Sequence, residues 1–469
     1  MDLLIIVLRG VKLQKEKEVK LSLAVLASGI MSFCGVLIET AMSVTFPTLM
    51  SEFNVSTASI QWITTIYLLV ISITVPLSSY LIKKFPLRYL FIFANIMFFV
   101  GLLSDMLAPS FGVLLLGRFF QGLATGIALP LMFHIILTYA PLHKRGTMIG
   151  LGFLITSVAP AIGPTYGGIL STNYSWHAIF LLLIPIVVLS LIIGVWAIPK
   201  IPVKTEEKLD WLGLIGITLV FSGALCFLSN LETLWSLGYL VITVIGGLIF
   251  YRASKQNPSP LIQLTLLRNR QFKLFLFAFL ICQMMLLGIS FIVPNYIQIV
   301  KNGSAFESGL VMIPGAITGA ILAPISGKIH DLYGAKRPIL IGIIITMIGW
   351  GMLSTFLGTI GSLGIVCGHI FYMIGIGLCY SNLMTVGMNQ VSKTLQNDGN
   401  AIFNTLQQFA GAVATAVVAV IINVVQKNSH LPLQAATTLG SKLAMFFILA
   451  LMGIAFIGCL RIFSKSTQS

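Results

Sequence analysis

Residues 21–50 read LSLAVLASGIMSFCGVLIETAMSVTFPTLM, and Glu39 is the only charged residue among them. The stretch is long enough to cross a bilayer as a helix, because a helix rises about 1.5 Å per residue and the hydrocarbon core is about 30 Å thick. A carboxylate in hydrocarbon costs several kcal/mol, roughly 2.5–3.5 even on the insertion scale measured for aspartate. We therefore expect Glu39 to be a functional group inside a membrane-spanning helix.

The composition of the whole chain is that of a polytopic membrane protein. Of its 469 residues, 57% are hydrophobic and 9% are charged, whereas a soluble protein has about 25% charged residues. The net charge of +15 comes from basic residues in short loops, as the positive-inside rule predicts. We therefore expect a lipid bilayer and no nucleic acid as partner. The six cysteines all lie in apolar segments and show neither disulfide nor metal-ligand spacing.

Apolar runs between charged or turn-rich breaks predict fourteen membrane-spanning helices. Lys and Arg cluster in alternate loops, which predicts that both termini are cytoplasmic. The expected spans are 21–50, 58–82, 88–107, 110–139, 146–170, 178–199, 211–229, 235–253, 272–299, 306–328, 337–357, 361–389, 398–425 and 440–463.

The sequence also contains an internal repeat. Pro76-Leu-Ser-Ser79 matches Pro324-Ile-Ser-Gly327 at an offset of 248 residues. Many transporters use such repeats to build two bundles that rock about a central site. We predict an all-α fold of two six-helix bundles plus two inserted helices. The expected segments are a cytoplasmic arm (1–20), an N-terminal bundle (21–199), the inserted pair with its linker (200–271), a C-terminal bundle (272–463) and a cytoplasmic tail (464–469).

The second copy of the repeat continues into a recognisable loop. Residues 324–337 read PISGKIHDLYGAKR, which resembles the loop signature of the major facilitator superfamily at Gly327, Asp331, Gly334 and Lys336. We expect Asp331 to cap the next helix and to pair with a base across the bundle interface, so that the loop gates the protein. The alternative is that it only shapes a cytoplasmic loop. The first copy has Ser79, Lys83, Pro86 and Arg88 at the same places, and Lys83 cannot act as the acid.

Two further motifs strengthen this resemblance. Leu-Gly-Arg118-Phe-Phe-Gln121-Gly122 is similar to the buried-arginine motif of the superfamily. Span five carries what resembles its antiporter motif, at Pro160, Gly163, Pro164, Gly167 and Gly168. We expect Gly163 and Gly167 to permit close helix packing and Pro164 to bend the span, with an ordinary small-residue contact as the alternative.

The first span resembles one family more narrowly. Leu37-Ile-Glu39-Thr40-x-x-Ser43-x-x-x-Pro47 is similar to the first-helix signature of fourteen-span drug:proton antiporters, in the form found in Gram-positive multidrug and lincomycin-type exporters. The common form has an acid one residue earlier, where this chain has Ile38. The resemblance implies a multi-pass protein of the cell membrane that exports small hydrophobic, cationic drugs in exchange for protons. The proton gradient would drive it, with no cofactor and no metal.

Charged residues within the spans are the candidates for proton coupling: Glu39, Arg118 and Asp105. We expect Arg118 to be the partner of Glu39, with a static ion pair or an arginine anchored on carbonyls as alternatives. Asp105 either handles protons or meets water near the outer end of its span. Buried His134 and His369 are interpreted as satisfied core histidines. The expected substrate-binding residues are Glu39, Thr40, Ser43, Gln121, Asn295, Tyr296, Gln298, Tyr380, Asn404 and Gln408.

Three other functions compete with drug export. A dedicated exporter of one metabolite, such as an amino acid or a sugar-like compound, would use the same fold. Few fixed polar groups are available, which favours broad specificity. A membrane enzyme would need clustered acids or a nucleophile beside its base, and the sequence shows neither, so we expect no enzyme. A receptor would show no transport in vesicles. We expect a monomer.

Overall fold

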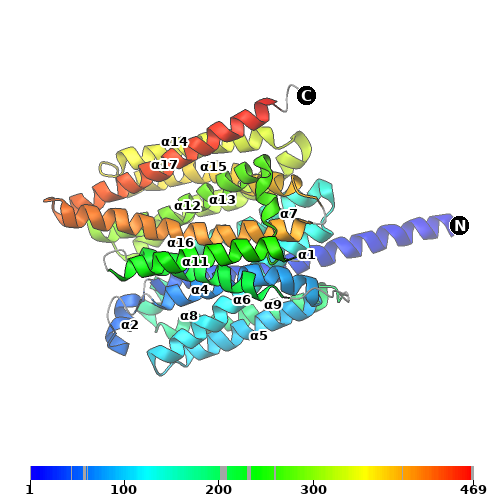
Figure 1. The fold of residues 1–469 in the computed structure, drawn as a ribbon, viewed down its shortest axis with the longest axis horizontal. Helices are drawn as coiled ribbons and strands as arrows, with labels where there is room; N and C mark the ends of the chain where they lie inside the picture. The colour runs from blue at the N-terminus through cyan, green and yellow to red at the C-terminus, as the bar shows by residue number, and fades with distance from the viewer. Residues whose placement is uncertain are drawn as a thin grey trace.

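A computed structural model describes residues 2–43, 45–55, 60, 62–200, 209–229, 234–257, 260–392 and 395–465. Long helices lying side by side make up nearly all of this part of the chain (Figure 1). Among the described residues, 13 helices are long and apolar enough to cross a membrane. Helix α7 (Arg145–Asn173), with 29 residues, covers the remaining expected span, so each of the fourteen expected spans overlaps a helix of the described residues.

The helices outside the inserted pair pack as two groups. The first group comprises α1 (Asp2–Ser43), α2 (Phe46–Phe53), α4 (Trp62–Lys84), α5 (Leu87–Met106), α6 (Phe111–Tyr139), α7, α8 (His177–Leu181) and α9 (Ile184–Ala197). The second group comprises α12 (Arg270–Asn295), η3 (Tyr296–Val300), α13 (Ala305–Tyr333), α14 (Lys336–Phe356), α15 (Ser362–Asn389), α16 (Gln396–Asn428) and α17 (Leu433–Lys465). The groups meet mainly where α7 packs on α13 and where α4 packs on α16.

Helix α1 ends earlier than the sequence suggests. It stops at Ser43, and the short helix α2 starts at Phe46. Pro47 explains the break, because its ring nitrogen cannot donate a helical hydrogen bond and proline is favoured at the start of a new helix. The expected span 21–50 is therefore wrong at its C-terminal end, and Glu39 lies four residues from the end of α1 rather than about eleven.

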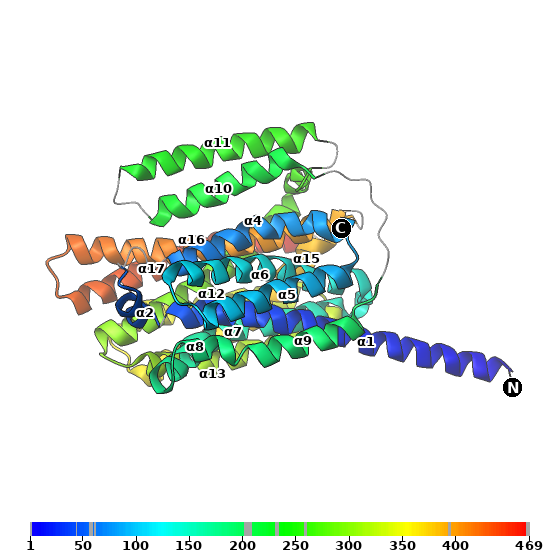
Figure 2. The ribbon, with the colours of Figure 1, turned by 90° about the horizontal axis from the view of Figure 1, so that it is seen from below.

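The two inserted helices lie beside the bundles rather than within them (Figure 2). Helix α10 (Trp211–Ser229) contacts both α4 and α16, and its Phe221 packs edge-on against Phe409 at 5.1 Å between ring centroids. Asp210 joins this pair to the following linker, since its carboxylate accepts hydrogen bonds from the backbone N–H groups of Gly213 (2.9 Å) and Leu261 (3.3 Å). Helix α11 (Trp235–Gln256) packs on the outer side of α10.

Candidate functional site

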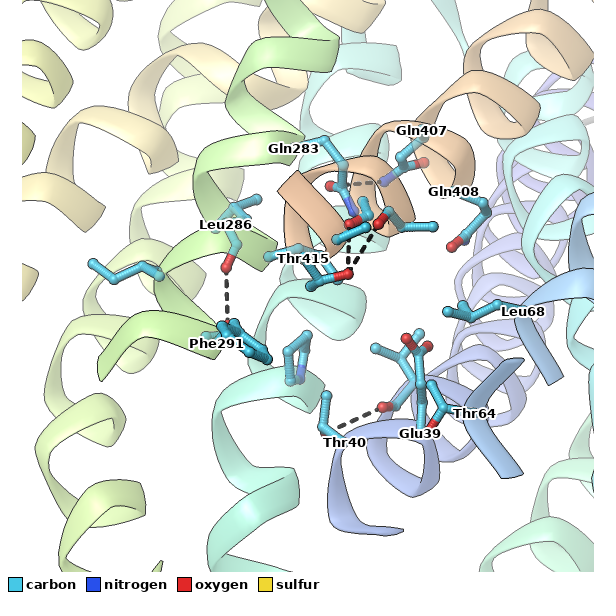
Figure 3. A pocket seen from close by; sticks show the side chains of 18 of the residues that line it. Glu39, Thr40, Thr64, Leu68, Gln283, Leu286, Phe291, Gln407, Gln408 and Thr415 are labelled. Carbon is cyan, nitrogen blue, oxygen red and sulfur yellow. Dashed lines mark hydrogen bonds between the residues drawn. The ribbon is translucent and has the colours of Figure 1, made fainter. Parts of the chain in front are cut away.

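A cavity of about 420 Å³ lies between the two groups of helices. Figure 3 shows Glu39, Thr40 and Thr64 on one side of it, and Gln283, Gln407 and Gln408 on the other. Most of the remaining lining is apolar, with Leu225 of the inserted helix α10 included. Glu39 is the one carboxylate among the described residues that line the cavity.

Glu39 is partly exposed to this cavity. Its carboxylate makes no hydrogen bond or ion pair with another described residue. The neighbouring Thr40 hydroxyl is occupied, because it lies within hydrogen-bond distance of the carbonyl oxygens of Val36 (3.3 Å) and Leu37 (3.2 Å). The lone pairs of Glu39 are therefore available to a proton or to a ligand, as a carboxylate is an acceptor when ionised and a donor when protonated.

Arg118 is fully buried, and it makes no direct ion pair or hydrogen bond with Glu39, although its positive charge still acts on the Glu39 carboxylate. Its Nε donates to the carbonyl oxygen of Ile63 (3.3 Å), and its Nη1 donates to Oε1 of Gln121 (2.7 Å). The guanidinium carbon also lies 4.2 Å from the ring centroid of Tyr67. Arg118 therefore ties α6 to α4, which is the carbonyl-anchoring alternative.

Asp105 belongs to the same polar network. The amide nitrogen of Gln121 donates to Oδ2 of Asp105 at 2.9 Å, so Gln121 links the carboxylate to Arg118. All three side chains are fully buried, and Asp105 does not meet water as one reading of the sequence suggested. The network links a buried carboxyl group to the buried guanidinium through Gln121, so hydrogen bonds satisfy part of the polar groups of both.

A second polar cluster lies on the opposite side of the cavity. The Tyr380 hydroxyl donates to Oε1 of Gln283, and Nε2 of Gln407 donates to the Tyr380 oxygen at 2.8 Å. The Tyr380 ring is stacked on Phe279, with centroids 4.5 Å apart and an angle of 13° between the planes. The three polar side chains come from α12, α15 and α16, so the cluster fixes the relative positions of these helices at the cavity wall.

Of the expected substrate-binding residues, Glu39, Thr40, Tyr380 and Gln408 line the cavity. Five others lie away from it for identifiable reasons. Gln121 is held in the Arg118 network, and Asn404 donates to Asn400 (2.6 Å to Oδ1). The three remaining residues sit near the α12–η3 junction: Asn295 donates to the carbonyl oxygen of Phe291, Tyr296 donates to that of Leu357, and Gln298 is exposed. The side chain of Ser43 lies outside the described residues.

The antiporter motif of α7 packs against the segment of α1 that carries Glu39. A Cβ atom on Gly163 would collide with the Thr40 side chain and would lie 2.9 Å from the carbonyl oxygen of Leu37. A Cβ on Gly167 would collide with the carbonyl oxygen of Ala41 and would lie 3.0 Å from its carbonyl carbon. Pro160 lines the cavity, Pro164 lies inside α7, and Gly168 is buried. The motif thus lets α7 approach the part of α1 that carries Glu39.

The loop signature at Gly327, Asp331, Gly334 and Lys336 joins the two groups of helices. It lies at the end of the molecule from which the N-terminal part of α1 projects (Figure 2). Oδ2 of Asp331 accepts hydrogen bonds from the backbone N–H (3.2 Å) and the hydroxyl (3.0 Å) of Thr147, in the first turn of α7. Asp331 therefore caps a helix of the other group, and the expectation that it caps the next helix, α14, is wrong. Gly334 has φ +85°, and this left-handed conformation ends helix α13. Of the other two residues of the signature, Gly327 packs on Gly146 and Lys336 is exposed.

Lys83 makes the corresponding contact from the other copy of the repeat. Its Nζ lies 3.6 Å from Oδ1 of Asp398, in the first turn of α16, and the side chains are 26% and 3% exposed respectively. Nearby, Nδ2 of Asn400 donates to the carbonyl oxygen of Pro130 (3.1 Å). The two groups are therefore bonded to each other on both sides of this end of the molecule.

Sequence reasoning missed several residues of these arrangements. The missed residues are Thr64 at the cavity, and Thr147 and Asp398 at the contacts between the groups. The internal repeat could have predicted Thr147 and Asp398, because two copies of one loop are expected to contact equivalent helix N-termini in the opposite bundle. The amides of the second bundle carried no signal of which would face the cavity.

Residues 28–415 match the family model of the Major Facilitator Superfamily. The chain belongs to this superfamily. It is 35% identical over 412 residues to the lincomycin resistance protein LmrB of Bacillus subtilis, covering 86% of this chain and 85% of that protein. It is 26% identical over 376 residues to the colistin resistance protein EmrB of Acinetobacter baumannii, covering 78% and 73%.

The fold of this major facilitator is similar to that of a solved structure. The crystal structure of the human organic anion transporter MFSD10 (TETRAN) matches with a TM-score of 0.66 at 13% sequence identity, over 94% of this chain and 99% of that one. Because the chain belongs to the Major Facilitator Superfamily and resembles its resistance transporters, it is a multi-pass membrane transporter and not an enzyme.

Proposed function

We propose that this transporter is a proton-coupled multidrug exporter, and that Glu39 binds either a proton or a cationic drug. The observation that carries the proposal is the position of Glu39, the one described carboxylate that lines a largely apolar cavity. Among the described residues it has no hydrogen-bond partner. A cationic group and a proton compete for such a carboxylate, because each neutralises the charge that burial disfavours. Binding of one therefore releases the other.

Competition between a proton and a cationic drug for Glu39 would couple drug export to the proton gradient. One pH unit provides about 1.4 kcal/mol per proton, and 100 mV provides about 2.3 kcal/mol per charge moved. One acid is therefore sufficient for a modest uphill drug gradient. The largely apolar lining suits compounds of varied shape.

Alternating access requires the Asp331–Thr147 and Lys83–Asp398 contacts between the two groups of helices to break. The basic loops lie at the end of the molecule that carries these contacts, and we propose from the positive-inside rule that this end faces the cytoplasm. The Asp331–Thr147 and Lys83–Asp398 contacts would then hold the cytoplasmic side closed, and exchange of drug for proton at Glu39 would shift the balance between the closed and open forms.

The relatives support export of drugs, since the names of two of them refer to lincomycin and colistin resistance. The second candidate, export of one metabolite, shares the fold but predicts a narrow substrate range. A screen of cationic and neutral compounds in proteoliposomes with an imposed pH gradient separates the two.

Proton release is the decisive test of the role of Glu39. Purified wild type in weakly buffered detergent should release protons when tetraphenylphosphonium or another lipophilic cation binds. Glu39→Gln keeps the shape of the side chain but cannot ionise, so it should release none and should lose pH-driven efflux. Glu39→Asp is the matched control and should retain part of both. Undiminished release from Glu39→Gln would show that the proton site is elsewhere.

A further inference from the structure

His369 is a buried polar side chain on the wall of the cavity. It lies in α15, is 1% exposed, and belongs to the residues that line the cavity together with Glu39. Its Nδ1 is enclosed and has no hydrogen-bond partner among the described residues. A core histidine in a stable protein normally has its buried nitrogens bonded, so the reading of His369 as a satisfied core residue is wrong.

The surroundings of the ring determine which nitrogen is available. Helix α13 passes close to it at Gly315, where a Cβ atom would lie 2.6 Å from Cε1 and would collide with Nδ1. On another side the ring faces Tyr372, with centroids 6.0 Å apart. Nδ1 is therefore enclosed against the backbone of α13. Among the described residues, Nδ1 is the His369 nitrogen that is enclosed without a partner. Because His369 lines the cavity, we infer that its other ring nitrogen, Nε2, faces the cavity.

The tautomer follows from the cost of an unpaired donor. A neutral imidazole carries one N–H and one acceptor nitrogen. An N–H at the enclosed Nδ1 would be a buried donor without a partner, whereas an N–H at Nε2 can bond to cavity water or to a ligand. The ring therefore presents a hydrogen-bond donor to the cavity.

We propose that His369 is a substrate-binding residue that donates a hydrogen bond from Nε2 to an oxygen of the exported compound. This inference rests on the proposed drug export and narrows its substrate class. The preferred substrates carry a cationic nitrogen for Glu39 and, on another part of the molecule, a carbonyl, hydroxyl or ether oxygen for His369. Cations without an acceptor use Glu39 alone.

Two probes separate the contributions of Glu39 and His369. Tetraphenylphosphonium is a lipophilic cation without hydrogen-bond groups, and lincomycin combines an amine with amide and hydroxyl oxygens. Equilibrium binding of each radiolabelled probe to the purified full-length protein should be measured for wild type, His369→Phe, His369→Asn and His369→Gln. Phenylalanine keeps a ring of similar size, the Asn amide mimics Nδ1, and the Gln amide reaches the position of Nε2.

We expect His369→Phe and His369→Asn to weaken lincomycin binding about five- to tenfold, the range for loss of one hydrogen bond. Tetraphenylphosphonium binding should change less than about twofold in both. His369→Gln should stay within about threefold of wild type for lincomycin. Equal losses for the two probes, or unchanged lincomycin binding in His369→Phe, would overturn the inference. So would a wild type that binds tetraphenylphosphonium but not lincomycin. A wild type that binds neither probe would instead refute the proposed drug export.

Discussion

Lys83 and Asp331 occupy equivalent positions of the repeat, 248 residues apart. Each contacts the group of helices to which it does not belong, but the two side chains have opposite charges. Asp331 caps the first turn of α7, and Lys83 meets Asp398 in the first turn of α16. A helix N-terminus attracts a negative charge, which Asp331 supplies directly. In the other copy Asp398 supplies that charge from within α16, and Lys83 supplies its counter-ion.

The Lys83–Asp398 pair predicts an asymmetric response to substitution. Lys83→Met removes the cation from a carboxylate that is 3% exposed, whereas Asp398→Asn leaves a lysine that is 26% exposed and can be hydrated. We expect Lys83→Met to slow transport in proteoliposomes about tenfold and Asp398→Asn about threefold, because the buried carboxylate is harder to hydrate than the partly exposed lysine once its partner is removed. The double variant should recover most of the rate. A double variant as slow as Lys83→Met would contradict this view.

The Asp331 cap predicts two defects of different size. Asp331→Ala removes the acceptor of both hydrogen bonds from Thr147, while Thr147→Val removes the hydroxyl and keeps the backbone N–H. Loss of a helix cap costs about 1 kcal/mol, with a further contribution from the charge at the helix end. We expect Asp331→Ala to reduce the transport rate clearly and Thr147→Val to reduce it less than about threefold. Equal effects would show that the backbone cap contributes nothing.

The glycines behind Glu39 predict a packing defect. Leu at Gly163 or Gly167 would collide with Thr40 or Ala41 and push α7 away from α1. Each variant should reach the membrane but lose transport, because Glu39 is held by this contact. Gly238→Leu is the matched control, since no atom lies within 4 Å of a Cβ at that position. Full transport by Gly163→Leu and Gly167→Leu would show that the motif match is incidental.

The structure agrees with the sequence-based predictions where a single residue, or the spacing within a single motif, was enough to make the prediction. Glu39 interrupts a long apolar run, so its placement in a membrane-spanning helix was predictable, and the glycine spacing of the antiporter motif predicted a close helix contact. The partner of Arg118 was not predictable, because it depends on how α5, α6 and α4 are rotated about their axes. The cluster of Gln283, Tyr380 and Gln407 likewise joins three helices whose relative rotation no local pattern encodes.

The network of Asp105, Gln121 and Arg118 gives the last prediction. Asp105→Asn keeps an oxygen that can accept the hydrogen bond from Gln121, but it places a neutral amide, whose two N–H groups need partners, in a fully buried network. A buried donor without a partner costs about 1–3 kcal/mol, so the variant should unfold at a lower temperature in detergent. If the network serves structure and Glu39 serves coupling, Asp105→Asn should still release protons when a cationic drug binds. Loss of that release in folded protein, with Glu39 intact, would transfer the coupling role to Asp105.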